Sequence, residues 1–239
     1  MPLYLPGSVV LGPRGSGASA PSSLTAFLAS IGKASWYGGF QAGVNMFSAT
    51  AGGGSSVTTN GANVGSWLPN NTAGGWTAVF NQGSSPKKPM YGTSRNGKPG
   101  IFGDADGLHF SFNSTTALNL PHTVLISAWT SQDSGCLYSH NTRTIAYLNG
   151  ASTDGDPNIY SGGVRNNQVA KALISTPATS TTASIKVGIS STGSAFYNTA
   201  PNLFRQSDAT AYTNSTIYEL WFVPWLTPSE ANVALTYLA

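Results

Sequence analysis

Residues 217–223, near the end of the chain, form an almost wholly hydrophobic run that contains one charged residue, Glu219. The segment is rich in aromatic and β-branched residues, which favour extended strands, and successive side chains of a strand point to opposite faces. Pro224 follows and cannot donate to a sheet, so the strand ends there. The pattern predicts a β-strand with one face formed by Ile217, Glu219, Trp221 and Val223 and the other by Tyr218, Leu220 and Phe222.

A helix is predicted directly after this strand. Thr227, Pro228 and Glu230 match a capping box. In this motif the threonine side chain accepts from the amide of the glutamate, the proline sits where no N–H is needed, and the glutamate reaches back. Apolar residues then recur at the spacing of a C-terminal helix, namely Ala231, Ala234, Leu235 and Leu238.

A shorter amphipathic helix is predicted over residues 22–31. A serine stands at its start and Gly32 follows its end, and its apolar residues fall at i, i+3, i+4 and i+7. This apolar face either covers the sheet of the same chain or contacts a partner chain. The apolar residues, which are candidates for docking to a partner, are Leu24, Phe27, Leu28 and Ile31.

Residues 1–21 are rich in proline, glycine and serine, a composition typical of an arm or linker. Within them Leu3, Tyr4 and Leu5 are further candidates for partner docking. We therefore divide the chain into residues 1–34, an arm and short helix for docking or oligomerisation, and residues 35–239, the main domain. Deletion of residues 1–33 is expected to leave the main domain folded.

From residue 35 onward, short apolar runs are separated by glycine, asparagine, serine and proline. Asn-Gly pairs at residues 60–61, 96–97 and 149–150 tolerate the positive φ of tight turns. This spacing predicts an all-β protein in which two antiparallel sheets form a sandwich, with a short helix near each end. The other strand candidates are residues 100–103, 108–112, 123–130, 144–148, 169–174 and 184–190.

The composition excludes several classes of protein. Of the 239 residues, 40% are hydrophobic and 8% are charged, which provides for a core and argues against disorder. The net charge is +3, and Lys87-Lys88 is the only adjacent basic pair, so no concentrated patch exists for nucleic acid. No apolar run approaches the roughly 18 residues of a membrane span, so we expect no membrane insertion. The single cysteine, Cys136, excludes an internal disulfide framework.

Three segments, taken in order, carry a family resemblance. Residues 57–67 (VTTNGANVGSW) form a turn and strand leading to a tryptophan, residues 96–112 (NGKPGIFGDADGLHFSF) form a hairpin with constrained turns, and residues 217–238 form the strand and helix described above. Together they resemble the concanavalin A-like lectin/glucanase superfamily, particularly the laminin-G-like jelly-roll modules of bacteriophage virion and cell-surface proteins. Over residues 36–239, the resemblance implies a two-sheet jelly roll with a concave face where relatives hold glycans, sometimes beside calcium.

The carboxylates of this chain do not match those of a hydrolase. Hydrolytic members of the superfamily place them two residues apart along one strand, as Glu-x-Asp-x-Glu, and this chain has no such triplet. Glu230 is explained as the capping residue. Glu219 shares a strand face with Trp221, so it needs exposure or a partner, for which Arg205 and Lys186 are candidates. One carboxylate cannot supply both acid and base, so we expect no catalytic residues and no enzyme activity.

Metal ligands have few candidates in the sequence. His109, His122 and His140 are far apart and no cysteine cluster accompanies them, which leaves zinc without a motif. Asp104 and Asp106 lie in a glycine-containing turn, where an aspartate usually bonds its own backbone. Their oxygens also suit a hard cation, so they are candidate calcium ligands, as are the oxygens of residues 154–158. We expect no other cofactor.

Aromatic side chains are the candidates for stacking on sugar rings. Trp76 follows the loop-like residues 70–75 and is a candidate for an exposed ring, whereas the position of Trp129 is not determined by its neighbours. With the strand carboxylate Glu219, these two are the candidate carbohydrate-binding residues. Three other tryptophans are expected in the core or under the terminal helix: Trp67, Trp221 and Trp225.

Two hypotheses about function follow from the resemblance and the layout. In the first, the chain is a non-enzymatic structural protein of a bacteriophage virion, such as a tail fibre, spike or head fibre, and binds host cell-surface polysaccharide for attachment. In the second, it is a decoration or connector that docks to other virion proteins through the N-terminal arm. Both place a homo-oligomer in the virion, assembled in the host cytoplasm. A secreted glycoside hydrolase is a third reading, disfavoured by the missing carboxylates.

Overall fold

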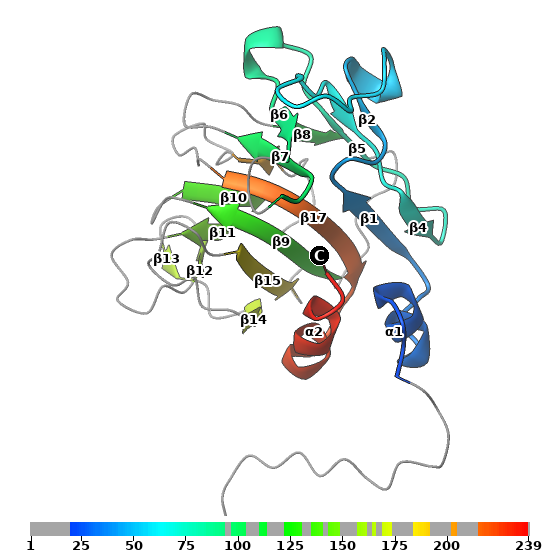
Figure 1. The fold of residues 1–239 in the computed structure, drawn as a ribbon. Helices are drawn as coiled ribbons and strands as arrows, with labels where there is room; N and C mark the ends of the chain where they lie inside the picture. Colours follow the sequence, from blue (N-terminus) through cyan, green and yellow to red (C-terminus); the bar gives the residue numbers. More distant parts are fainter. Residues whose placement is uncertain are drawn as a thin grey trace, which may run out of the picture.

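Antiparallel β-strands make up most of the secondary structure that the computed structural model describes, and two short helices lie beside them (Figure 1). The strands form two sheets, which confirms the all-β class predicted from the spacing of apolar runs. The structure describes residues 20–93, 97–103, 110–113, 122–130, 135–140, 143–148, 157–161, 164–165, 169–173, 184–191, 202–204 and 215–238.

The first sheet has eight strands, and β17 lies in the middle of it. Its order is β14-β15-β9-β17-β1-β4, and β7, which also pairs with β6, is bonded to the first residues of β17. The bounds are β1 Tyr37–Gln41, β4 Asn71–Ala73, β6 Met90–Gly92, β7 Gly100–Gly103, β9 His122–Thr130, β14 Val169–Leu173, β15 Ser184–Ser191 and β17 Ser215–Pro224.

The second sheet has nine strands in the order β13-β12-β11-β10-β16-β8-β5-β3-β2. The predicted strands of both sheets begin and end within about two residues of the observed ones, because each apolar run is bounded by turn residues. The bounds are β2 Met46–Phe47, β3 Ser66–Trp67, β5 Val79–Asn81, β8 Phe110–Asn113, β10 Gly135–His140, β11 Arg143–Leu148, β12 Pro157–Ser161, β13 Val164–Arg165 and β16 Asn202–Leu203.

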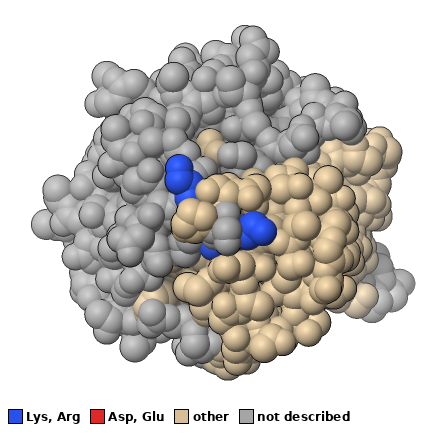
Figure 2. Space-filling model, turned by 90° about the horizontal axis from the view of Figure 1, so that it is seen from above, with Lys and Arg blue, Asp and Glu red and all other residues tan. Residues whose placement is uncertain are grey.

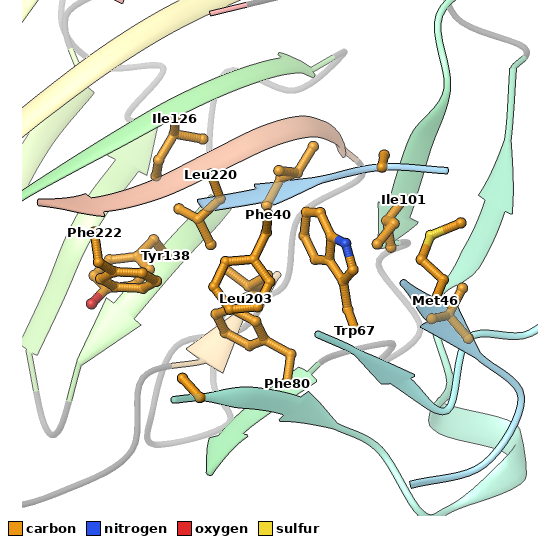
Figure 3. Packing of buried hydrophobic residues seen from close by; sticks show 14 of the residues in the cluster. Phe40, Met46, Trp67, Phe80, Ile101, Ile126, Tyr138, Leu203, Leu220 and Phe222 are labelled. Carbon is orange, nitrogen blue, oxygen red and sulfur yellow. The ribbon is translucent and has the colours of Figure 1, made fainter. Parts of the chain in front are cut away.

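The inner faces of the two sheets share one hydrophobic core. Phe40 of β1 lies at its centre, with its ring centroid 5.3 Å from that of Trp67 and 5.1 Å from that of Phe80, both in edge-to-face geometry. Figure 3 shows Phe40, Leu220 and Phe222 of the first sheet directed toward the rings of the second. Such pairs add about 0.5–1.5 kcal/mol each beyond the burial of their area, so this contact holds the sheets together.

A β-bulge in β17 changes which side chains enter this core. Ile217 pairs with Ala128 of β9 and Glu219 with the next residue, Ser127, so Tyr218 is the extra residue of the bulge. Ile217 therefore belongs to the shared core, whereas Glu219 points to the outer face of the sheet. The simple alternation predicted from the sequence is wrong for Ile217, because the bulge reverses the order of the faces at that point.

Two helices cover one end of this outer face. Helix α1 (Leu24–Ser30) begins after the cap Ser23, and α2 (Pro228–Leu235) has the predicted capping box between Thr227 and Glu230. They lie side by side at the same end of the molecule (Figure 1). Together with residues of β9 and β17 they form a second core, whose buried members are Leu24, Phe27, Leu28, Leu125, Trp221, Val223, Leu226, Ala231, Ala234, Leu235 and Leu238.

The apolar face of α1 thus covers the protein's own sheet, which is one of the two alternatives predicted from the sequence. Leu24, Phe27 and Leu28 are buried, and Ile31 packs against the same cluster. Naming Leu24, Phe27 and Leu28 for partner docking was wrong, because α2 and the sheet already occupy their apolar surface. Ile31 is half-buried, and its docking role stays a prediction. The other docking candidates, Leu3, Tyr4 and Leu5, lie outside the described residues.

An ion pair joins the two helical segments. Lys33, just after α1, donates from Nζ to Oε2 of Glu230 in α2 at 2.6 Å, and the same ammonium lies 5.1 Å from the ring centroid of Trp225. Partial burial would raise the pKa of Glu230, but hydrogen bonds from Lys33 and Thr227 outweigh it and lower this pKa. The pair therefore fixes α1 to α2 while the carboxylate is charged.

Candidate functional site

A row of polar side chains crosses the outer face of the first sheet, beside the end that the helices cover. Gln41 of β1 pairs with Glu219 of β17, Glu219 pairs with Ser127 of β9, and Ser127 pairs with Lys186 of β15. Directly paired residues of antiparallel strands project to the same face, so these four side chains form one line, called here the polar row. With neighbouring strands about 4.8 Å apart, the row spans roughly 14 Å.

The bulge at Tyr218 is the reason that the row includes a carboxylate. In a regular strand Glu219 and Ile217 would share a face, so either the charge would enter the core or the isoleucine would leave it. The extra residue lets both take their observed positions, with Ile217 inside and Glu219 outside. Bulges often reorient a side chain in this way at binding sites.

The carboxylate of Glu219 is held in place by a neighbouring indole. Trp221 Nε1 donates to Glu219 Oε1 at 2.7 Å. The indole lies flat over Gly39 of β1, where an added Cβ would come within 2.7 Å of three ring atoms. Because only a glycine leaves this space, the backbone of β1 fixes the ring, and the ring orients the carboxylate. Trp221 is itself buried, as expected from the sequence.

Lys186 forms the other end of the row. Its Nζ donates to the backbone carbonyl of Leu238 at 2.6 Å, next to α2. Burial and the nearby charge of Lys98 lower the pKa of Lys186, and the charge of Glu219 acts in the opposite direction. Glu219 therefore interacts electrostatically with Lys186, one of the two partners considered from the sequence; the other, Arg205, lies outside the described residues.

Several groups of the row reach the surface. Gln41 is exposed, Glu219 and Lys186 are half-buried, and Ser127 is buried beneath them. Gln41 Oε1 also accepts from Asn70 Nδ2 at 3.4 Å, which extends the polar surface past β1. A ligand lying on this face would meet an amide, a carboxylate and an ammonium in succession, which are the groups that bind hydroxyls and anions.

The two candidate tryptophans are not on the surface. Trp76 is 1% exposed and stacks on Phe222 in the shared core, with ring centroids 5.5 Å apart, over the space that Gly38 leaves. The expectation of an exposed ring at Trp76 is wrong, because Gly38 on β1 creates a cavity for the indole that its polar sequence neighbours do not reveal. Trp129 is 3% exposed, although it lies on the same strand face as Ser127 of the row.

The candidate calcium ligands Asp104 and Asp106, and residues 154–156 of the second candidate segment, lie outside the described residues. Within the described part of the chain, no group of three or more His, Cys, Asp or Glu side chains is placed to hold a metal ion. The acidic residues described there are Glu219, in the row, and Glu230, which caps α2 and binds Lys33.

Among the described helices none is long and apolar enough to cross a membrane.

Sequence reasoning identified Glu219, its neighbour Trp221 and its candidate partner Lys186, but it missed Gln41 and Ser127. Gln41 and Ser127 join it through strand pairing between segments about 90 residues or more apart in sequence, so no local pattern marks them. Lys98 follows the Asn-Gly turn at residues 96–97 and has no motif of its own.

No family model matches the chain, and comparisons with curated proteins and with solved structures give no match.

Proposed function

We propose that this protein is a non-enzymatic attachment protein of a bacteriophage particle, with a concanavalin A-like jelly roll that binds cell-surface polysaccharide at the polar row. The particle setting and the jelly-roll topology rest on the resemblance of residues 57–67, 96–112 and 217–238. Two antiparallel sheets with a shared core agree with that resemblance. The binding surface is the outer face of the first sheet, beside the two helices.

The observation that carries the proposal is the 2.7 Å hydrogen bond from Trp221 Nε1 to Glu219 Oε1. It orients a half-buried carboxylate in line with the exposed amide of Gln41 and the ammonium of Lys186. Sugar hydroxyls both donate and accept, so a fixed carboxylate next to an amide suits them. Because the carboxylate is oriented before a ligand arrives, less conformational freedom is lost on binding. Recognition is then mainly polar, since Trp76 and Trp129 are buried.

The same geometry supports binding without bond cleavage. Hydrolysis of a glycosidic bond ordinarily uses two carboxyl groups on either side of the bond. Among the described residues, the row contains Glu219 alone, and Glu230 is engaged in the cap of α2 and with Lys33. A saccharide on the row would therefore be held by hydrogen bonds and released intact.

Glycan arrays and a reducing-end assay with the purified protein test this proposal. The wild-type protein should retain a polysaccharide and release no new reducing ends. Gln41→Ala and Glu219→Gln should each weaken binding by about tenfold or more, since each removes or neutralises a polar partner of the ligand. Asn232→Ala is the matched control, because Asn232 is exposed on α2 and is not one of the four residues of the row.

Three other outcomes would contradict the proposal in distinct ways. Turnover that disappears in Glu219→Gln would make the protein a hydrolase. Absence of binding, together with co-purification of the protein with intact phage particles, would favour a decoration or connector. Absence of the protein from purified particles, measured by mass spectrometry, would remove the virion setting and leave the saccharide-binding site to be judged alone.

A further inference from the structure

Both charged side chains of the polar row bond to members of the second core. Trp221 Nε1 donates to Oε1 of Glu219 at 2.7 Å, and the carbonyl of Leu238 accepts from Lys186 Nζ at 2.6 Å. Trp221 and Leu238 are buried in the second core, which also contains the buried side chains of α1. The row is therefore joined at two points to a core that α1 helps to form.

The indole of Trp221 lies between the sheet and the helices. It projects from the outer face of the sheet, yet it is only 5% exposed. Gly39 of β1 lies directly under the ring, and Tyr37 lies beside it. The members of the second core that lie outside the sheet come from α1, α2 and the residues next to them. These helical segments therefore cover the outer side of the indole.

Helix α1 depends on the contacts that dock it. Phe27 stacks on Tyr237, with ring centroids 5.7 Å apart, and Lys33 donates to Glu230 at 2.6 Å. The helix has seven residues, and isolated helices shorter than about 12–15 residues are marginal in water. We therefore expect α1 to be helical while it is docked and to unfold when it leaves α2 and the sheet. It has two discrete states.

We infer that α1 is a positioning element of the ligand site: while it is docked, it keeps the Trp221 indole against β1 and so keeps the Glu219 carboxylate oriented for the saccharide. This rests on the proposed function, and α1 itself touches no ligand. When α1 leaves, water reaches the outer side of the indole and competes for its N–H. The carboxylate then gains conformational freedom that ligand binding has to remove, so the affinity falls.

A second path leads from α1 to the other charged group of the row. Phe27 stacks on Tyr237, and the carbonyl of the next residue, Leu238, is one of the groups that place the Lys186 ammonium. Coupling between two sites is reciprocal in free energy, so a bound saccharide holds α1 more firmly in return. Residues 1–19 precede α1 in the chain, so a partner that pulls on them acts on α1 first and lowers the affinity of the row.

The first measurement needs no saccharide. The indole N–H signal of Trp221 in a nitrogen–proton correlation spectrum, assigned by its absence in Trp221→Phe, reports the bond to the charged Glu219 carboxylate. Glu219→Gln gives the position of this signal without the charged acceptor. Phe27→Ala should move the signal of the otherwise unchanged protein toward that position, and Lys33→Gln should move it less. Phe27→Leu keeps an apolar side chain and should restore most of the shift.

Two controls match these variants at the other end of the molecule, where β2 and β6 lie (Figure 1). Met46→Ala removes a buried side chain of the shared core in β2. Lys87→Gln removes an exposed lysine just before β6. Figure 2 shows lysine or arginine and no acidic side chain on the described part of this end, so no acidic partner is in view there. Both controls should leave the Trp221 signal in place.

The second measurement is calorimetry with the array polysaccharide that the wild-type protein retains most strongly, at a temperature where every variant is folded. Phe27→Ala should weaken binding about fivefold or more, Phe27→Leu should recover most of this loss, and Met46→Ala should bind like the wild-type protein. Saturation with the same polysaccharide should slow hydrogen exchange of the α1 amides in the wild-type protein.

The outcomes separate this inference from the proposed function. An unmoved Trp221 signal in Phe27→Ala, or in Lys33→Gln if Phe27→Ala does not fold, would overturn the inference. An equal shift in Met46→Ala would also overturn it, because general loosening would then be the cause. A moved signal with unchanged affinity would overturn the coupling to the ligand. A moved signal in a protein that retains no polysaccharide would overturn the proposed function but confirm that α1 positions Glu219.

Discussion

Gly39→Ala is the substitution that tests most directly how the carboxylate of Glu219 is positioned. The added Cβ would come within 2.7 Å of Cδ2, Cε2 and Cε3 of Trp221, closer than carbon atoms can approach without movement. The ring must then leave the surface of β1, and its hydrogen bond to Glu219 is stretched or broken. Gly39 has no positive φ, so the backbone itself accepts alanine and the effect comes from this contact alone.

The size of the effect follows from the rigidity of the contact. The Trp221 indole is buried in the core under the helices and pairs with Tyr37, with ring centroids 5.9 Å apart, so it cannot move freely. Overpacking of this kind costs about 1–3 kcal/mol. In a chain of this length each kcal/mol lowers the melting temperature by about 2–4 °C. Saccharide binding should fall as well, because the carboxylate loses its orientation.

Urea unfolding followed by tryptophan fluorescence measures the stability change, with the m-value as a check that both states keep their compactness. Gly83→Ala is the matched control, because its Cβ would meet only Thr50 Cγ2 at 3.7 Å, an ordinary contact. The same Gly39→Ala change in a Trp221→Leu background should cost much less, since the smaller side chain leaves room. Equal stability of Gly39→Ala and Gly83→Ala, or full additivity with Trp221→Leu, would refute the reasoning.

Three further predictions concern the helices. Leu28→Ala should lower the free energy of unfolding by about 2–5 kcal/mol, because Leu28 is fully buried. Val233→Ala is the control and should change this free energy little, because Val233 is 43% exposed. Equal effects of the two substitutions in urea unfolding would contradict the described packing. Deletion of residues 1–33 is expected from the sequence to leave the main domain folded, and it should lower the melting temperature in a thermal melt, because it removes α1 from the second core. An unchanged melting temperature would show that α1 adds nothing to stability. The pKa of Glu230 is lowered, so its pairing with Lys33 stabilises the fold at pH values above the ordinary pKa of a glutamate, and this stabilisation is lost as the pH falls through the lowered value. Glu230→Gln should lack this loss of stability in acid, which is worth at most about 1 kcal/mol for a partly exposed pair. The same dependence of stability on pH in Glu230→Gln and in the wild-type protein would contradict this prediction.

Features that depend on neighbouring residues were predictable from the sequence. The capping box of α2 is one example, because Thr227 and Glu230 satisfy each other's hydrogen bonds whatever lies around them. The strand β17 is another, since its aromatic and β-branched residues favour an extended backbone. The turn glycine at residue 61 has the positive φ that its Asn-Gly pair indicated.

Features that depend on strand pairing were not predictable. The bulge at Tyr218 arises from the register between β17 and β9, so the apparent alternation of residues 217–223 misplaced Ile217. Trp76 has polar sequence neighbours, yet its ring fills the space over Gly38, which is 38 residues away along the chain. The polar row has the same origin, because each pairing brings one of its members from a distant segment.

The hydrogen bond from Lys186 to the carbonyl of Leu238 has a practical implication for anything joined to the end of this chain. An affinity tag, a fluorescent protein or a neighbouring module attached after residue 239 would emerge next to Lys186, at the margin of the surface where we place the ligand. Such an appendage would compete sterically with long polymers. Immobilisation for binding measurements should therefore avoid the carboxyl terminus.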